Sequence, residues 1–192
     1  MRIAVASDHA GFIQKAPIIE HIKSLGHEVI DLGPATDDRV DYPDFGDKVG
    51  RMVARGDADR GVVICGTGLG IAMTADKVPG VRATAIQTVQ FAELCREHND
   101  CNVIGLSGRF VPLELNEQIV DTFLTTEFGG GRHTGRVQKI MREDDPSFEG
   151  VPVDFTGQES TWPRRCGRPH LRNVLERREA RVSRCPASSG LR

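Results

Sequence analysis

Short runs of β-branched residues alternate with helical segments along most of this 192-residue chain. Residues 61–66, GVVICG, form a continuous apolar run, which is typical of a strand buried on both faces of a parallel sheet. Residues 11–26 instead carry isoleucines and a leucine near helical spacing and end at Gly26. Strands that alternate with helices through short links require a parallel sheet. The pattern therefore predicts an open, doubly wound (Rossmann-like) α/β sheet with helices on both faces.

The same criteria place the other elements in strict alternation. Strands are expected at residues 3–7, 27–33, 61–66, 81–86 and 103–107. Helices are expected at residues 11–26, 45–56, 71–78, 89–99, 113–126 and 133–143. Residues 41–44, DYPD, are expected to form a turn.

Charge and composition divide the chain into two unequal parts. Residues 1–146 hold 16 Lys and Arg against 22 Asp and Glu, whereas residues 147–192 hold nine Arg, no Lys and five acidic residues. The second part has few aliphatic residues and no sustained period, so it cannot bury enough apolar area to offset its ordering entropy. We therefore expect one domain at 1–146 and an Arg-rich, disordered extension at 147–192.

Composition also excludes several classes of protein. The net charge of −2 argues against a general nucleic-acid or membrane-surface binder, and the chain has no apolar run long enough to span a bilayer. The five cysteines form no CxxC pair and no Cys/His spacing suited to zinc, so no metal is expected. An odd cysteine count without a recognisable secretory signal predicts reduced thiols and a cytoplasmic protein.

Residues able to hold anions or move protons follow three predicted strands. In an open parallel sheet, ligands bind beyond the carboxyl ends of the strands. The segments concerned are 7–11, 65–70 and 105–109. We add residues 96–100, which end the helix before the last strand and include His98 and Asn99.

The segment CGTGLG, residues 65–70, is the most informative of these. Its three glycines allow a sharp turn in which several N–H groups point at one anion or developing oxyanion. The spacing GxGxG on the third strand differs from the dinucleotide fingerprint GxGxxG on the first, and no P-loop lysine follows. The glycines alone would also suit a structural turn.

Cys65 favours the catalytic interpretation of this loop. It stands where aligned N–H groups and nearby cations can support a reactive thiolate. A cysteine at a strand end is also often a small buried hydrophobic residue, which is how we interpret Cys95 and Cys101.

Arg132 and Arg136 lie four residues apart after a run of glycines, so both guanidinium groups can face one phosphate dianion. A solvated basic helix face is the alternative for this pair. His9, beside Asp8, and His98, beside Asn99, are the remaining candidates for proton transfer or binding.

Six segments together resemble one family, the RpiB/LacAB-type sugar-phosphate isomerases, which includes type B ribose-5-phosphate isomerase. They are ASDHAGF (6–12), EVIDLG (28–33), DYPDF (41–45), ICGTGLGIAMTADKVPGVRA (64–83), REHNDCNVIGLSGR (96–109) and GGRHTGRV (130–137). The resemblance covers roughly residues 1–143. Because position 65 is Cys and position 71 is Ile, the chain resembles the branch that uses a cysteine as base.

The resemblance implies a cofactor-free aldose–ketose isomerase that forms a homodimer or homotetramer with its active site at the subunit interface. It implies Cys65 as the base at C2 and C1, and His98, with Asp8 nearby, as the group that opens the sugar ring. Thr67 and the N–H groups of Gly66, Gly68, Leu69 and Gly70 would hold the enediolate oxyanion. Sugar or phosphate contacts are implied for His9, Tyr42, Asn99, Arg109, Arg132 and Arg136.

Ribose 5-phosphate is the substrate we expect. Allose 6-phosphate, galactose 6-phosphate or a tetrulose phosphate are alternatives, because the sequence does not display pocket depth. A non-catalytic sugar-phosphate binding subunit is a further alternative, although binding alone does not require a thiol.

Overall fold

The computed structural model describes residues 1–145, so the extension predicted at 147–192 lies outside the described residues. The strands are β1 (Arg2–Ser7), β2 (Glu28–Asp31), β3 (Arg60–Cys65), β4 (Ala83–Ile86) and β5 (Val103–Ser107). The helices are α1 (Phe12–Ser24), α2 (Tyr42–Ala54), α3 (Leu69–Asp76), α4 (Val89–Asn99), α5 (Leu113–Thr125) and α6 (Thr134–Asp144), with a short 3₁₀ helix η1 (Gly131–His133) before α6. Among these residues, no helix is long and apolar enough to cross a membrane.

The five strands form one parallel sheet in the order β2-β1-β3-β5-β4. Ser7 at the end of β1 pairs with Ile64, and Cys65 at the end of β3 pairs with Ser107 at the end of β5. The carboxyl ends of the three central strands therefore lie side by side. The predicted open, doubly wound parallel sheet is confirmed.

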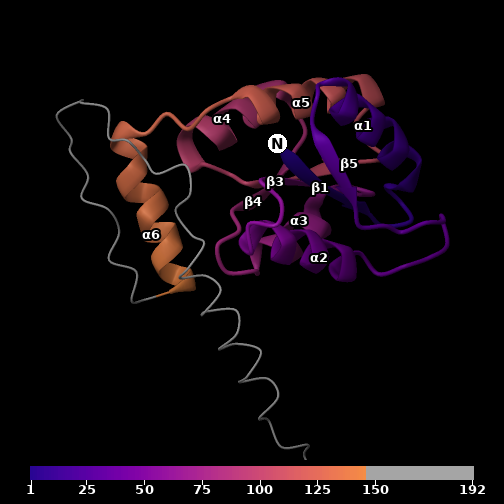
Figure 1. Cartoon of the computed structure of the whole chain (residues 1–192), viewed down its shortest axis with the longest axis horizontal. Helices are drawn as coiled ribbons and strands as arrows, with labels where there is room; N and C mark the ends of the chain where they lie inside the picture. The colour runs from indigo at the N-terminus through magenta and orange to yellow at the C-terminus, as the bar shows by residue number, and fades with distance from the viewer. Residues whose placement is uncertain (146–192) are drawn as a thin grey trace, which may run out of the picture.

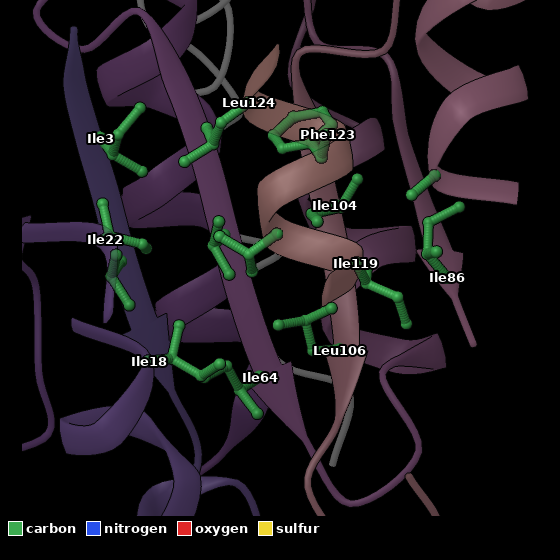
Figure 2. Packing of buried hydrophobic residues seen from close by; sticks show 14 of the residues in the cluster. Ile3, Ile18, Ile22, Ile64, Ile86, Ile104, Leu106, Ile119, Phe123 and Leu124 are labelled. Atoms are coloured by element: carbon green, nitrogen blue, oxygen red, sulfur yellow. The ribbon is translucent and has the colours of Figure 1, made fainter. Parts of the chain in front are cut away.

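Helices α1, α4 and α5 cover one face of the sheet, and α2 and α3 cover the other (Figure 1). The core on the first face joins Ile18 and Ile22 of α1 to Phe123 of α5 across Ile64 and Ile104 of the sheet (Figure 2). β3 is buried along its whole length, as its unbroken apolar run predicts.

One local prediction is wrong. Residues 41–44 do not form a turn, because Asp41 is the N-cap of α2 and Tyr42 is its first residue. Pro43 lies in the first turn of this helix, where the N–H that proline lacks would have no intrahelical partner. A proline therefore marks the beginning of this helix rather than a break before it. The predicted bounds of α4 and β5 are confirmed, and most other ends shift by one to three residues.

α6 stands apart from the layered body of the molecule (Figure 1). Its carboxyl-terminal half is tied to the chain just before β4: Gly80 N–H donates to the Asp144 carboxylate at 2.7 Å, and Arg82 Nη1 donates to Met141 Sδ at 3.1 Å. α6 is therefore held at the edge of the sheet, beside the amino end of β4.

We predict that Leu124→Ala lowers the free energy of unfolding by about 2–5 kcal/mol, because Leu124 is buried in the core shown in Figure 2 and its removal leaves a cavity. Leu25→Ala is the matched control, since Leu25 is 41% exposed. Urea unfolding of both variants measures the difference. Equal losses in the two variants would contradict this account of the core.

Candidate active site

Three loops come together at the carboxyl edge of the sheet. Gly108 N–H donates to the carbonyl of Cys65 at 2.8 Å, and Asp8 N–H donates to the carbonyl of Ile64 at 3.0 Å. The backbones approach so closely that a Cβ on Gly11 would lie 2.5 Å from the Ile64 oxygen. The loops after β1, β3 and β5 thus form one compact surface around Cys65.

Cys65 ends β3 with its side chain almost fully buried. The N–H of Gly68 donates to Cys65 Sγ at 3.1 Å, which is the kind of contact that a thiolate accepts. Gly68 has φ +78°, and a Cβ there would lie 2.9 Å from the carbonyl carbon of Leu106. Only glycine therefore allows the loop to turn back and direct this N–H at the sulfur.

The predicted oxyanion nest, Gly66 to Gly70, leads directly into α3, which begins at Leu69. The hydroxyl of Thr67 accepts the N–H of Leu69 at 3.3 Å, which leaves its proton directed elsewhere. The loop is therefore a polar turn at a helix N-terminus beside a thiol. This arrangement can hold negative charge next to a base.

Tyr42 and Arg109 flank the glycine loop. The Tyr42 ring packs against Gly70 so closely that a Cβ there would lie 2.7 Å from ring atoms. The Arg109 side chain passes Gly66, with its Cδ 3.5 Å from the position of a Cβ on that glycine. Both residues therefore belong to the Cys65 cluster, although only Arg109 was expected there from its place after a predicted strand.

Asp8 and His9 complete this first cluster. One carboxylate oxygen of Asp8 accepts the N–H groups of Ala10 and Gly11 at 2.8 and 2.9 Å and so fixes the turn into α1. His9 Nδ1 lies 3.1 Å from the carbonyl of Val40, to which it can donate only when Nδ1 carries the proton. That bond orients the ring and leaves Nε2 for a ligand.

The remaining candidates form a second cluster at the end of α4. The His98 ring stacks on that of His133 with centroids 4.2 Å apart and planes inclined by 6°. Arg132 Nε donates to His133 Nε2 at 3.2 Å, and Gly129 N–H donates to the carbonyl of Glu97 at 2.9 Å. Asn99 follows His98 on α4, and Arg136 lies in the first turn of α6; both are exposed.

The two clusters lie at opposite edges of the sheet. α4 follows β4 and runs back, so its last turn leads into the start of β5, where Asn102 O accepts Gly61 N–H at 2.9 Å. β3 has six residues, so its two ends are roughly 15 Å apart. Within one chain, therefore, His98 does not lie near Asp8 or Cys65. The expected proximity of Asp8 to His98 is therefore not found within the described chain.

His133 is a member of the second cluster that no sequence pattern had indicated. Burial and then the nearby His98, Arg132 and Arg136 lower the pKa of its imidazole, and Glu97 opposes this effect. A neutral ring is also the form that accepts the Arg132 N–H. The motif RHTGR placed His133 between the two arginines, but no sequence signal indicated its stacking on His98.

No group of three His, Cys, Asp or Glu side chains in residues 1–145 is arranged to hold a metal ion.

The fold and the site together define a class of protein: an open parallel α/β enzyme with a thiol and a glycine loop at the carboxyl edge of its sheet. The sequence profile of the Ribose/Galactose Isomerase family matches residues 3–140. The chain therefore belongs to this family, and the predicted family resemblance is confirmed.

Relatives and solved structures named ribose-5-phosphate isomerase B match this chain. Ribose-5-phosphate isomerase B of Escherichia coli (strain K12) is 45% identical over 139 residues, which are 72% of this chain and 93% of that protein. The solved structure of the Clostridium thermocellum ribose-5-phosphate isomerase B is 49% identical with a TM-score of 0.75, covering 76% of this chain and 99% of the other. The Mycoplasma genitalium enzyme with bound ribulose 5-phosphate is 46% identical with a TM-score of 0.72, covering 74% and 95%.

We predict that Gly70→Ala displaces the Tyr42 ring, because the new Cβ would occupy its place and a half-exposed side chain moves more easily than the backbone of α3. Tyr42 is the only tyrosine in the chain, so its NMR ring resonances report the displacement without ambiguity. The stability cost of Gly70→Ala should largely disappear in a Tyr42→Ala background. Unchanged tyrosine resonances in Gly70→Ala would show that the ring does not pack on this glycine.

Proposed function

We propose that this chain interconverts ribose 5-phosphate and ribulose 5-phosphate with Cys65 as the base. The observation that carries the assignment of the base is the placement of Cys65 Sγ against the Gly68 N–H at the start of the glycine loop. Family membership and the relative with bound ribulose 5-phosphate support the substrate. The chain is an aldose–ketose isomerase.

The reaction requires a base and an oxyanion site within reach of the same two carbons. The Cys65 thiolate takes the proton from C2 of the open-chain aldose, and the electrons pass to the carbonyl oxygen O1. The N–H groups of Gly66 and Gly70 and the Thr67 hydroxyl stabilise the resulting enediolate, because the Gly68 and Leu69 N–H groups already donate within the loop. Cys65 then returns the proton to C1, while the hydroxyl proton moves from O2 to O1 and leaves a carbonyl at C2.

Ring opening and phosphate binding need the second cluster. Ribose 5-phosphate is mainly a closed furanose, and we assign the proton transfer that opens it to His98. Arg132 and Arg136 hold the phosphate dianion, helped by His9 and Arg109 from the first cluster. Asn99 and Tyr42 bind the sugar hydroxyls.

Because the clusters lie at opposite edges of one sheet, a complete site combines Cys65 of one subunit with His98, Arg132 and Arg136 of another. Large exposed apolar side chains at the carboxyl edge support such an assembly. They are Ile13, Leu69, Met73, Phe91 and Phe110, between 48% and 79% exposed. A second copy of the chain that packed its amino edge against these side chains would bring its own His98 to Cys65. We therefore propose a homodimer, or a homotetramer built from such pairs, as the active form.

Cys65→Ala is expected to abolish conversion of ribose 5-phosphate, because no other described group at the carboxyl edge lies in the same place against the glycine loop. Binding of the sugar phosphate should stay within a few-fold, since the arginines remain. Coupled assays of turnover without added metal and calorimetric titration with substrate measure the two effects, with Cys95→Ala as the thiol control. Turnover in Cys65→Ala would overturn the assignment of the base.

The shared site predicts complementation between two inactive variants. Cys65→Ala and His98→Ala homodimers each lack one half of every site. After the subunits are mixed and exchanged, half of the dimers hold one intact site, so about a quarter of the wild-type activity should return. Unmixed variants serve as controls. Failure of activity to return, with subunit exchange shown by native mass spectrometry, would place His98 and Cys65 in the same subunit's site.

A further inference from the structure

Asp100 has an unusual backbone conformation at the end of α4. It is the C-cap residue of this helix, with φ +49° and ψ +41°, and it is the only residue other than glycine with positive φ in residues 1–145. Glycine adopts this conformation most easily, and aspartate does so less readily. Glycine would suit the backbone turn better, so the side chain of Asp100 has a further role.

The Asp100 carboxylate lies between two arginines. Its Oδ1 accepts from Arg96 Nη1 and its Oδ2 from Arg82 Nη2, both at 2.8 Å. The backbone carbonyl of Asp100 also accepts from Arg82 Nε at 2.8 Å. All three side chains are at most 14% exposed, so solvent screens these contacts little.

Asp100 also compensates a group of buried positive charges. Arg60 and Arg96 both lie over the Phe123 ring, with guanidinium carbons 5.2 and 5.9 Å from its centre. Burial and then the charge of Arg96 lower the pKa of Arg60 to about 10, and Asp100 is one of the two carboxylates that oppose this. The carboxylate thus holds together side chains that would otherwise repel one another.

The same network reaches α6. The Arg82 N–H donates to Asn102 Oδ1 at 2.8 Å, and Asn102 Nδ2 donates to the carbonyl of Gly80 at 2.9 Å. Arg82 and Gly80 in turn hold Met141 and Asp144 of α6. Asp100 therefore connects two elements. Through Arg82 it fixes the end of α4, which carries His98, relative to α6, which carries Arg136.

We propose that Asp100 is a positioning residue: its carboxylate, held by Arg82 and Arg96, sets the direction in which His98 is presented to the Cys65 site of the partner subunit. This inference rests on the proposed function, because it concerns the ring-opening step assigned to His98. Both carboxylate oxygens of Asp100 accept from arginines, so we assign it no contact with the substrate. It acts through the turn that it closes.

Ring opening and proton transfer can be measured separately. In ribose 5-phosphate the aldehyde is closed by O4, so turnover requires ring opening. In ribulose 5-phosphate the carbonyl is at C2 and O5 is esterified, so the sugar is open and C1 deprotonation needs no ring opening. Incorporation of solvent deuterium at C1 of ribulose 5-phosphate therefore reports on Cys65, and turnover of ribose 5-phosphate reports on Cys65 and His98 together.

The test compares Asp100→Gly and Asp100→Asn in the full-length protein. Asp100→Gly keeps the left-handed turn and removes the carboxylate, and Asp100→Asn keeps the shape and removes the charge. We expect ribose 5-phosphate turnover in Asp100→Gly to fall about 10- to 100-fold, because small misplacements of a reacting group have effects of this size. Deuterium exchange at C1 of ribulose 5-phosphate should stay within about threefold. Turnover of ribose 5-phosphate by Asp100→Asn should lie between that of Asp100→Gly and that of the wild type.

Asp121→Asn is the matched control. Asp121 Oδ1 lies 2.6 Å from His21 Nε2 in a hydrogen bond between α5 and α1, and it belongs to neither cluster. We expect this variant to match the wild type in both measurements. Circular dichroism checks folding, and if Asp100→Gly does not fold, the same two measurements on Asp100→Asn decide.

Wild-type turnover in Asp100→Gly would overturn the inference. An equal loss of turnover and of deuterium exchange would also overturn it, because Asp100 would then support the whole site rather than the direction of His98. A wild-type protein that does not convert ribose 5-phosphate would instead contradict the proposed function, so the two failures are distinguishable.

Discussion

The common direction of the five strands is the constraint on which the rest of the structure depends. Because β1, β3 and β5 are parallel and in register, the loops that follow them meet at one edge and form the Cys65 cluster. The same direction sends α4 back along the sheet, so His98 comes to the opposite edge. A sheet of this kind cannot bring these two residues together within one chain. This separation within one chain is the structural basis of the proposed site shared between two subunits.

Close backbone contact makes the first cluster rigid. A side chain at Gly108 would lie 2.8 Å from the Gly11 Cα, and one at Gly68 would meet the backbone of β5. These glycines lose more conformational entropy on folding than other residues, and the buried central strands offset that loss. Close packing therefore sets the backbone of this loop before a substrate arrives, which suits the proposed stabilisation of an enediolate.

The parallel sheet and the Cys65 cluster could both be predicted from the sequence, because both follow from local patterns. A buried apolar run marks each central strand, and polar residues directly after it mark the loop at its carboxyl end. The separation of His98 from Cys65 could also have been predicted, because a helix that follows a strand ends at the opposite edge of the sheet. The stacking of His98 on His133 could not have been predicted. It depends on the path of residues 126–133, where Gly130 and Gly131 have positive φ and no periodicity indicates a direction.

The two clusters are stabilised by different kinds of interaction, and this difference suits their proposed roles. The first cluster lies on the apolar core, which fixes the position of Cys65 through close packing. The second lies on the end of α4 and on α6, which stands apart from the layered body of the molecule (Figure 1). Apolar packing has no preferred direction, whereas an arginine bound to a carboxylate defines both distance and orientation. In the proposed shared site, the direction of His98 is therefore set by a buried polar network, which the ion pairs of Asp100 with Arg82 and Arg96 provide.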